Sequence, residues 1–396
     1  MRIGMILDKT FPPDPRVENE AISLVKNGFE VYLFCLSYGN EQKEEIYKGI
    51  HIIRFSSNKL IYKLSALAYT VPFYTWIMTP KIRLFIKKYT IESVHIHDIQ
   101  IAESVFRANK QKLPIVLDLH DNIPEIMKFY PHLQKFPGKQ LISPKNWKKK
   151  EELFIRKATK VCTVSQEFIN EVVKRTKINR EKITLVPNTI LKSFYTDYSF
   201  DNSILEKYKN KFVILYLGDT GLRRGLLTAI DSVSLLKNEI PELKLVIVGK
   251  NTTDKVLINR IKELNILKFV DLEGWQDVGL FPSYILSSKV CISPLYRNIQ
   301  HDVAYANKLF QYMSFAKPVL VSNATAQKNL IEKTNSGLVH VEKDAADFAS
   351  KVLTLYRDEN LRNKLGENGK RFVEEEFHWE ITSKKLINLY RSLKIN

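Results

Sequence analysis

Short apolar runs alternate with amphipathic helical patterns along almost the whole chain, and this alternation constrains the fold more than any other feature. In the first half, the runs with the character of strands are Ile3–Leu7, Val31–Cys35, His51–Phe55, Ser93–Ile96, Ile115–Asp118, Lys160–Val164 and Ile183–Val186. The helical patterns between them include Val17–Lys26, Ile101–Asn109, Lys149–Lys157 and Gln166–Arg175. Strands that alternate with helices predict βαβ units and a parallel sheet.

A second series of the same kind follows a break at Pro187–Thr189. Its strand-like runs are Phe212–Leu217, Leu243–Val248, Val270–Leu272, Val290–Ser293, Pro318–Ser322 and Gly337–His340. Its helical patterns are Leu226–Leu236, Lys255–Leu264, Ala345–Arg357, Glu359–Val373 and Trp379–Leu393. The polar stretch Lys192–Lys211 has the composition of an interdomain connection.

A chain of 396 residues is too long for one ordinary core. The sequence therefore predicts an α/β protein of two Rossmann-like, doubly wound parallel-sheet domains, over residues 1–190 and 210–378. Ligands of such sheets bind at the carboxyl ends of the strands, so these ends are where we look for functional residues.

The positive charge of the chain is concentrated in one quarter of it. The formal net charge is +18, and residues 51–150 hold 17 Lys and Arg against 6 Asp and Glu, a surplus of 11. Such a field attracts nucleic acid, anionic lipid or sugar phosphates, but no zinc-finger, RNA-recognition or basic-zipper motif favours nucleic acid. The apolar run Leu64–Thr79, interrupted by Pro72, is too short to span a bilayer. It is either a pair of helices in the membrane interface or a buried, kinked helix.

The three cysteines indicate a reducing compartment. Cys35, Cys162 and Cys291 each lie in an apolar run, and their spacing suits no metal site, so we expect buried thiols and a cytoplasmic location. The N-terminal segment Met1–Asp8 has the pattern of a buried strand and not of a signal peptide.

Two strands of the first domain end in histidine beside aspartate. His97 and Asp98 follow one strand, and His120 and Asp121 follow the next. Because the carboxyl ends of parallel strands meet at one edge of a sheet, both pairs are expected to open onto one crevice. A histidine and a carboxylate at such an edge are suited to bind or polarise hydroxyl groups.

In the second domain, two segments have the character of an anion site. Gly218 and Gly225 flank Arg223 and Arg224 just after the first strand, which suits a diphosphate by charge and by backbone N–H groups. Farther on, a short polar loop from residue 302 leads into an amphipathic helix, predicted over Lys308–Phe315, whose N-terminus attracts anions. The alternatives are a solvated turn and an ordinary α/β connection.

Taken in order, these segments resemble retaining family-4 glycosyltransferases of the GT-B fold, and the resemblance covers essentially the whole chain. Pro12–Ala21 is similar to the Pro-x-x-x-Arg-Val-x-x-Glu-Ala opening of that family. Gly218–Gly225 is similar to its Gly-Arg-x-x-x-x-Lys-Gly loop, and Asn307–Val319 to its Asn-Lys-x-x-Glu-Tyr-Met and Gly-Lys-Pro-Val motifs. The resemblance implies two domains facing across a cleft and a C-terminal helix, from about residue 380 to 396, that returns to the first domain.

The resemblance also implies roles for individual residues. His120, in its neutral form, and Asp121 would be catalytic, with His120 bonded to the donor sugar. Residues on the acceptor side would be Arg16, His97 and Asp98. The donor would be held by Gly218, Arg223, Arg224, Trp275, Asn307, Lys308 and Gln311. Two alternatives stay open: Arg16 pairs with Glu20 four residues on, and Trp275 packs instead of stacking on the nucleobase.

Three positions depart from the family pattern. Asp219 stands where the family has arginine, which leaves Arg223 as a replacement, and Val303 and Gln311 stand where it has two acids. A glutamine amide still hydrogen-bonds ribose hydroxyls. Asp302 or His301 is close enough in sequence to replace the first acid.

The sequence therefore predicts a hexosyl-type glycosyltransferase that moves a sugar from a nucleotide-diphosphate sugar to a glycan or lipid-linked acceptor, with retention. No Asp-x-Asp motif is present, so no metal and no cofactor is expected. Surface polysaccharide or lipopolysaccharide synthesis, at the inner face of an anionic membrane, would fit the basic first half. The alternatives are a nucleotide-sugar epimerase of the same fold and a catalytically inactive homologue that acts as a membrane-associated assembly subunit.

Overall fold

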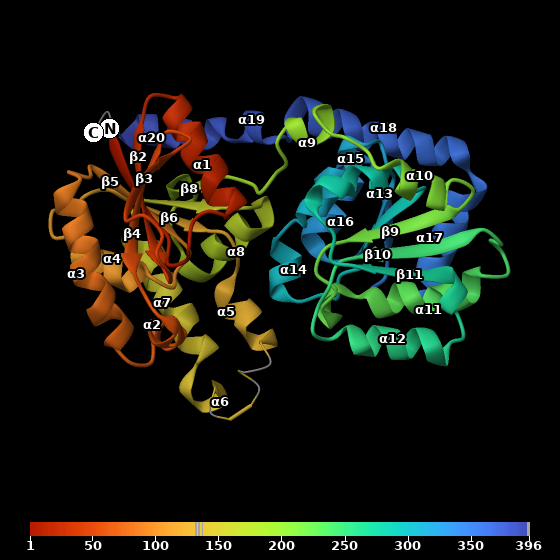
Figure 1. Ribbon diagram of the computed structural model, residues 1–396, viewed down its shortest axis with the longest axis horizontal. Coiled ribbons are helices and arrows are strands. Elements are labelled where there is room, and N and C mark those ends of the chain that lie inside the picture. The colour runs from red at the N-terminus through yellow and green to blue at the C-terminus, as the bar shows by residue number, and fades with distance from the viewer. Residues whose placement is uncertain (131–132, 134, 137, 394–396) are drawn as a thin grey trace. The chain divides into compact units, whose positions relative to one another are not determined.

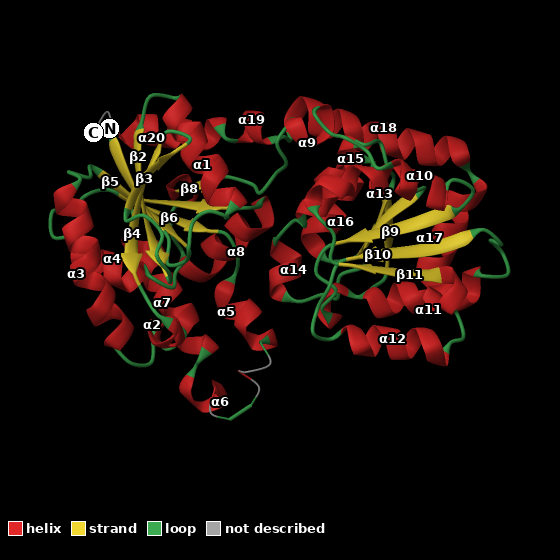
Figure 2. Ribbon diagram, viewed as in Figure 1, coloured by secondary structure: helices red, strands yellow, loops and turns green. Residues whose placement is uncertain are grey.

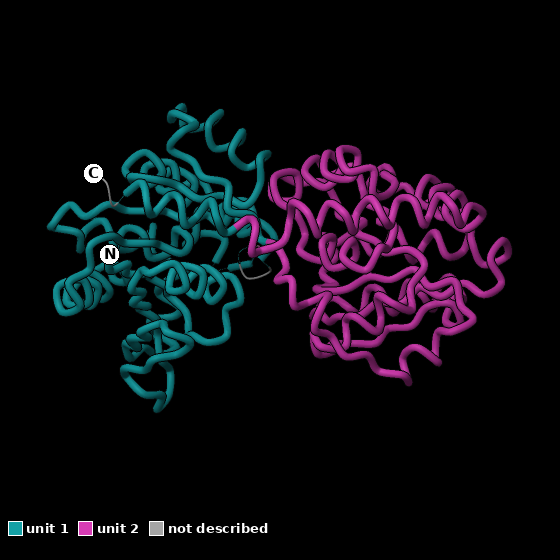
Figure 3. Tube along the Cα trace, turned by 90° about the horizontal axis from the view of Figure 1, so that it is seen from above, with its two compact units in different colours: residues 1–188, 383–396 teal, residues 189–382 magenta. Residues whose placement is uncertain are grey.

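The chain divides into two compact units. A computed structural model describes residues 1–130, 133, 135–136 and 138–393. Unit 1 comprises Met1–Asn188 together with the C-terminal segment from Ser383, and unit 2 comprises Thr189–Thr382 (Figure 3). Each unit is a sheet with helices on both sides (Figures 1 and 2). The two-domain α/β architecture expected from the sequence is confirmed.

Unit 1 is built on eight strands in the order β3-β4-β2-β1-β5-β6-β7-β8. Their bounds are β1 Arg2–Ile6, β2 Glu30–Ser37, β3 Glu44–Tyr47, β4 Ile50–Ser56, β5 Ser93–His97, β6 Ile115–Leu119, β7 Lys160–Thr163 and β8 Ile183–Leu185. All neighbours pair in parallel except β3 and β4, which form a hairpin. Its turn, Lys48 and Gly49, has positive φ at both residues, as tight hairpins require. The polar edge strand β3 was not predicted, because it has almost no apolar pattern.

The helices of unit 1 cover both faces of this sheet. Their bounds are α1 Pro15–Lys26, α2 Lys59–Ser65, α3 Phe73–Lys88, α4 Ala102–Ala108, α5 Ile123–Ile126, α6 Gly138–Leu141, α7 Pro144–Lys157, α8 Gln166–Thr176 and α20 Lys384–Leu393. From β4 onward the chain crosses the sheet in the direction opposite to its first step from β1 to β2. Because crossovers are right-handed, α1 lies on one face and α3, α4, α7 and α8 lie on the other. Among the described residues no helix has both the length and the apolar character needed to cross a bilayer.

Unit 2 has six parallel strands in the order β11-β10-β9-β12-β13-β14. They are β9 Phe212–Leu217, β10 Leu243–Val248, β11 Val270–Gly274, β12 Val290–Ser293, β13 Val319–Ser322 and β14 Gly337–His340. Alternate residues of β9 enter opposite cores: Ile214 and Tyr216 lie in one hydrophobic cluster, and Leu215 lies in the other. The sheet is therefore buried on both faces, which is why its strands read as continuous apolar runs.

The helices of unit 2 are α9 Ser193–Thr196, α10 Asn202–Tyr208, α11 Leu226–Leu236, α12 Asp254–Glu263, α13 Phe281–Ser287, α14 Ile299–Val303, α15 Asn307–Ser314, α16 Thr325–Thr334, α17 Ala345–Arg357, α18 Glu359–Glu376 and α19 Trp379–Thr382. The predicted segments account for α11, α12, α15, α17 and α18 of unit 2, whereas α9, α10, α13, α14 and α16 were not predicted. The polar loop was expected to begin at residue 302, and this is wrong because residues 302 and 303 belong to α14. The helix after it is shifted by one residue from the predicted bounds.

The stretch Lys192–Lys211 was predicted to be an interdomain connection, but it is part of unit 2. It contains α9 and α10, and α10 packs on α13 and buries Ile204 and Tyr208. The Tyr208 hydroxyl also hydrogen-bonds the carboxylate of Glu273 at 2.9 Å. α9 has no buried side chain and α10 has two, which leaves too little periodicity for these helices to be recognised in the sequence.

The C-terminal segment divides between the units at residue 382. The single helix predicted over Trp379–Leu393 is two helices, of which α19 belongs to unit 2 and α20 packs on α1 and β8 of unit 1. Tyr390 of α20 hydrogen-bonds Nδ1 of His95 on β5 at 2.8 Å, and both side chains are fully buried. Residues 394–396 of the expected return helix lie outside the described residues.

We predict that Tyr390→Phe lowers the free energy of unfolding of unit 1 by about 1–3 kcal/mol, because it leaves the buried Nδ1 of His95 without its partner. Urea denaturation followed by circular dichroism measures this change. Tyr198→Phe is the control, because Tyr198 is a part-exposed residue of unit 2 whose ring contacts Phe315 edge to face. Equal stability of the two variants would contradict the inferred contribution of α20.

Candidate functional site

At the carboxyl end of the unit 1 sheet, polar side chains gather on the face covered by α1. His95 and His97 alternate with apolar residues along β5, and Asp118 pairs with His97 on the neighbouring strand β6. Because side chains two apart on a strand share a face, all three point toward α1, which contributes Arg16 and Glu20. The side chains are almost completely buried. The sequence placed His97 at this edge but did not identify the acid Asp118 that the other groups surround.

Asp118 is the centre of a buried ion-pair network. Nη2 of Arg16 lies 2.9 Å from Oδ1 of Asp118, Nε lies 3.2 Å from Oδ2, and Nη2 also lies 3.0 Å from Oε1 of Glu20. Nη1 donates to the carbonyl of Val186 at 3.1 Å. The predicted alternative, a pair between Arg16 and Glu20, is therefore present. Arg16 orders the buried interior of unit 1, and its guanidinium is turned inward.

The titration of the two carboxyl groups follows from this arrangement. Burial acts against the charge of Asp118, but Arg16 and His120 outweigh it and hold its pKa well below the usual range. Glu20 is equally buried and faces the charge of Asp118, and these effects raise its pKa to about 8 despite Arg16. At neutral pH the network therefore holds one carboxylate and one protonated carboxyl group.

His120 is the member of the network that is partly exposed at the carboxyl edge of the sheet. Its Nε2 lies 2.7 Å from Oδ2 of Asp118, and its backbone N–H donates to Oδ1 of Asp98 at 3.2 Å. Nδ1 of its ring lies 3.8 Å from Oδ2 of Asp98, and about 15% of the side chain is exposed. Nδ1 of His97 lies 3.1 Å from Nε2 of His120. The two predicted His-Asp pairs are thus brought together.

The charge of His120 differs from the expectation of a neutral imidazole. Burial lowers the pKa of His120, but the carboxylates of Asp118 and Asp98 raise it by a larger amount. The pKa is therefore about 9. His97 stays neutral, since burial and the neighbouring His95 and His120 hold its pKa well below the usual range. His120 is therefore an imidazolium that donates hydrogen bonds. The neutral form was expected because the sequence did not identify Asp118 as its partner.

Carboxyl groups line the same edge beside His120. Asp98 has φ of 61°, a conformation that a residue other than glycine adopts at a cost of about 1–3 kcal/mol and that is common at functional sites. Asp121 follows β6, and Asp8 follows β1, where burial raises its pKa to about 6. Asp8 was not among the predicted site residues, although an acid at a strand end was the available signal. Acids at this edge can accept hydrogen bonds from hydroxyl groups.

A metal ion does not suit the interior of this cluster. Ligand atoms of Glu20, His95, His97 and Asp118 lie within 4.8 Å of one another, as they would around a cation. However, Arg16 already places a guanidinium against both carboxyl groups, and both oxygens of Asp118 are bonded to Arg16 or His120. A positive side chain thus takes the position that a cation would need.

In unit 2, the loop after β9 and the start of α15 meet. Gly218 has φ of 110°, and a Cβ placed on it would lie 3.3 Å from Nζ of Lys308. Nη1 of Arg223 lies 3.1 Å from Nε2 of His301 on α14. The two segments predicted to share an anion site, residues 218–225 and 302–311, are therefore adjacent. The φ of 110° explains why glycine is needed at position 218.

Lys308 is buried without an acidic partner of its own. Its ammonium lies 3.5 Å from the centre of the Tyr216 ring, and within the described residues it forms no ion pair. Burial, together with Arg224 and Arg223, holds its pKa well below the usual range. An anion bound in front of these three cations would reverse that shift and favour the charged form.

Asp219, which replaces an arginine of the family pattern, orients Arg224. Nε of Arg224 donates to Oδ2 of Asp219 at 3.0 Å, and Nδ2 of Asn251 donates to Oδ1 at 2.6 Å. These hydrogen bonds, together with the charge of Arg224, keep the pKa of Asp219 low in spite of partial burial. Arg223, suggested as the replacement cation, lies 3.9 Å from the same carboxylate. The departure at 219 therefore leaves both guanidiniums beside Gly218.

Near α15, Asp302 and His301 are less suited to replace the acid that the family has at position 303. Val303 is buried, and Asp302 is held by Nε of Arg297 at 3.1 Å and by the backbone N–H of Thr325 at 2.8 Å. Burial and the two neighbouring arginines lower the pKa of His301 to about 4, so its neutral ring can accept from Arg223. The contacts of Asp302 with Arg297 and Thr325 thus hold α14 in place.

The helix α15 itself begins without a side-chain cap. Its N-cap residue is Ala306, so no side chain accepts from its first N–H groups. Asn307 opens the helix, and Gln311 lies one turn on, partly exposed. Trp275, which follows β11, is 70% exposed, so the alternative that it simply packs is wrong. Its ring is available for stacking.

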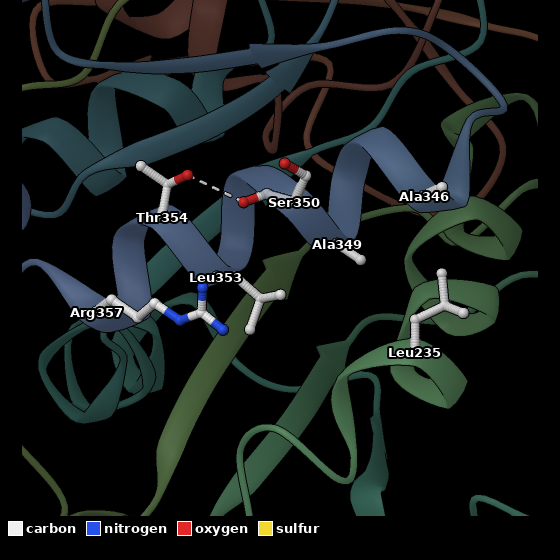
Figure 4. A pocket seen from close by; sticks show the side chains of 7 residues that line it. All are labelled: Leu235, Ala346, Ala349, Ser350, Leu353, Thr354 and Arg357. Carbon is white, nitrogen blue, oxygen red and sulfur yellow. Dashed lines mark hydrogen bonds between the residues drawn. The ribbon is translucent and has the colours of Figure 1, made fainter.

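A separate hollow of about 420 Å³ lies between α11 and α17 (Figure 4). Its lining is mostly aliphatic and small, with Arg357 at one end bonded to Glu239. None of the predicted site residues lines it, so it is not the candidate site.

Comparison with known proteins gives two family matches that follow each other along the chain. The model named Glycosyltransferase Family 4 matches residues 16–191, and Glycosyl transferases group 1 matches residues 197–372. The capsular polysaccharide biosynthesis glycosyltransferase CapM of Staphylococcus aureus is 22% identical over 244 residues. That match covers 59% of this chain and 62% of CapM, so it spans less than two thirds of the relative.

Solved structures resemble the chain over its full length. A sucrose-phosphate synthase of Thermosynechococcus elongatus matches with a TM-score of 0.80 and 17% identity, covering 100% of this chain and 99% of the other. HepE of Anabaena, in complex with UDP, matches with a TM-score of 0.72 and 16% identity, covering 99% and 100%. At such identities the likeness establishes the fold.

We predict that His120 titrates near pH 9 and that Asp118→Asn moves its midpoint down by at least one pH unit, because the nearest negative charge is removed. Histidine ring signals in NMR measure both. The raised pKa also means that the His120–Asp118 pair stabilises the fold fully below about pH 6.5 and that this contribution is lost as the pH rises through about 9. His301, with its pKa near 4, is the internal control that Asp118→Asn should leave unchanged. A midpoint of His120 near 6.5 in the unsubstituted protein would contradict the network.

Proposed function

The chain is a glycosyltransferase of the GT-B type, with a family-4 N-terminal half and a group 1 C-terminal half, and on that premise we propose that it transfers a sugar from a nucleotide-diphosphate donor to a glycan or lipid-linked acceptor. The single observation that carries the proposal is the group of three cations, Arg223, Arg224 and Lys308, beside Gly218. Three positive side chains with one carboxylate between them are suited to a diphosphate.

The donor would be bound by unit 2. Arg224 and Arg223 would meet the diphosphate oxygens, with the ammonium of Lys308 and the uncapped N–H groups at Asn307 adding charge and dipole. Trp275, exposed after β11, would stack on the nucleobase. Gln311 would hydrogen-bond the ribose.

The same groups would stabilise the leaving diphosphate. As the glycosidic bond breaks, negative charge builds up on the phosphate oxygens, and fixed cations aimed at that charge lower the barrier. We therefore propose transfer without a metal ion, because side chains here provide the positive charge that a metal provides in other enzymes.

Unit 1 would bind the reacting sugars. His120, as an imidazolium anchored by Asp118, would donate from Nδ1 to an oxygen of the donor sugar. Asp121 and Asp98 would accept from the acceptor hydroxyl and orient it, with the neutral His97 behind them. The family resemblance supports retention of the anomeric configuration and a hexosyl donor.

We further propose that the acceptor is linked to lipid and that the protein works at the inner face of an anionic membrane. The surplus of 11 positive charges over residues 51–150 supports this location. The likeness to the capsular polysaccharide enzyme CapM supports a role in surface polysaccharide synthesis.

Incubation of the purified protein with single UDP- and GDP-sugars tests the function. We expect slow hydrolysis of one donor to nucleoside diphosphate and free sugar, because a transferase without acceptor passes the sugar to water. NMR of the sugar released at early times reports the anomer, and retention is expected. His120→Ala should lower the turnover and leave the affinity for the nucleotide largely unchanged.

Two results would replace this function by another one. Inversion at C2 of a donor sugar would identify an epimerase. No binding of any nucleotide would favour an inactive homologue that acts as an assembly subunit, in line with Val303 and Gln311 at the positions of the family's acids.

We predict that Arg224→Ala weakens binding of the matching nucleoside diphosphate by about 1.5–3 kcal/mol, the size of a charged hydrogen bond. Isothermal titration calorimetry measures the affinity. Arg260→Ala, which removes an equal charge from an exposed pair with Asp231 in the same unit, is the control. An unchanged affinity in Arg224→Ala would rule out this diphosphate site.

A further inference from the structure

Helix α3 of unit 1 has two unlike faces. Its inner face buries Tyr74, Met78, Ile82, Phe85 and Ile86 against the sheet. Its outer face, at positions 73, 76, 80, 83, 84 and 87, forms one stripe with a helical period of three and four residues. The helix contains no acidic residue.

The outer stripe carries large apolar side chains in water. Phe73, Trp76 and Leu84 are 50%, 58% and 57% exposed, and the rings of Phe73 and Trp76 contact each other edge to face at 5.5 Å. The preceding helix α2, which packs on α3, adds exposed Leu60 and Tyr62. Such a group of exposed aromatic and aliphatic side chains marks an interaction surface.

Positive side chains surround a hollow on the same stripe. It has a volume of about 350 Å³ between α3 and α4, and it is lined by Trp76, Thr79, Pro80, Arg83, Arg107 and Lys110. Glu103, the one acid in the sequence of α4, is already bonded to Arg107 at 2.6 Å and to Lys150 at 2.9 Å. Positive charge is therefore in excess around the hollow.

The composition of this surface selects its partner. Cations that alternate with tryptophan, phenylalanine and leucine along one helix suit the boundary between lipid headgroups and acyl chains. There the aromatic rings sit at headgroup depth and the cations meet phosphates. A nucleic-acid groove would instead use the cations along an extended backbone path, with the aromatic rings as stacking platforms.

We propose that the outer stripe of α3 and the hollow that it shares with α4 dock on a bilayer of anionic phospholipid. Phosphate groups occupy the hollow beside Arg83, Arg107 and Lys110, while Phe73, Trp76 and Leu84 enter the headgroup region. This inference rests on the membrane-bound acceptor proposed above, and it names the surface that would bring the protein to that acceptor.

Vesicle sedimentation tests the proposal with the full chain. Vesicles of phosphatidylcholine mixed with phosphatidylglycerol are expected to bind the protein, and vesicles of phosphatidylcholine alone much less. Arg83→Ala with Lys110→Ala should lower the partition coefficient on the order of 20-fold, because each surface cation contributes roughly a factor of five. Trp76→Ala should weaken binding to both kinds of vesicle.

The matched control removes the same charge from another helix of unit 1. Lys384 and Lys385 are exposed on α20, which packs on α1 and β8. Lys384→Ala with Lys385→Ala should change the partition coefficient less than threefold. An equal loss in this control, or no sedimentation of the unsubstituted protein with anionic vesicles, would overturn the proposal. Retention of the protein by single-stranded RNA in preference to anionic vesicles would also overturn it.

Nucleotide affinity separates this inference from the donor-site proposal. Calorimetry with the matching nucleoside diphosphate should give equal affinities for the unsubstituted protein and for Arg83→Ala with Lys110→Ala. Loss of vesicle binding with unchanged nucleotide affinity supports the docking surface on its own. A protein that binds vesicles but no nucleotide would contradict the donor site and leave the docking surface standing.

Discussion

A carboxylate can be buried only if cations and hydrogen-bond donors compensate it, and the carboxyl edge of the unit 1 sheet is organised around one such group. Asp118 lies inside the sheet, held by Arg16 from α1 and by His120 just beyond the end of its own strand. Removal of one member of such a network leaves an uncompensated charge, which costs about 3–5 kcal/mol. Because of this constraint, α1, β5 and β6 must keep their positions relative to one another, and the His120 ring has one orientation.

In unit 2, cations outnumber the carboxylate that lies among them. Arg223, Arg224 and Lys308 gather beside Gly218, with Asp219 as the carboxylate among them. Burial lowers the pKa of Lys308 because its charge lacks a partner. A site that keeps cations together at this cost is prepared for an anion, since the ligand supplies the missing charge. The two units thus separate the tasks: one carries an anchored hydrogen-bond donor beside carboxyl groups, and the other a cationic cradle.

The surrounding residues compensate for some of the positions that depart from the family pattern and not for others. Asp219 does not remove the cationic site, because it bonds Arg224 and Asn251 and fixes the guanidinium beside the glycine loop. Asp302 bonds Arg297 and Thr325, so it does not replace the acid missing at Val303. His301 lies beside Arg223 as a neutral ring. A change inside an ion-pair network can be compensated by its neighbours, whereas a carboxylate replaced by a buried valine cannot.

The sequence by itself determined most of the strands, the longer helices, the two domains and the glycine loop with its arginines, because apolar periodicity and glycine content are local properties. It did not reveal β3, α9, α10, α13, α14 and α16, which are stabilised by contacts with other segments more than by their own pattern. Nor did it reveal the charge of His120 or the inward turn of Arg16. Both depend on Asp118, and the burial and distances that set them exist only when β5, β6 and α1 are packed together. The pKa of a side chain follows from its neighbours in space, and only the tertiary structure decides who those neighbours are.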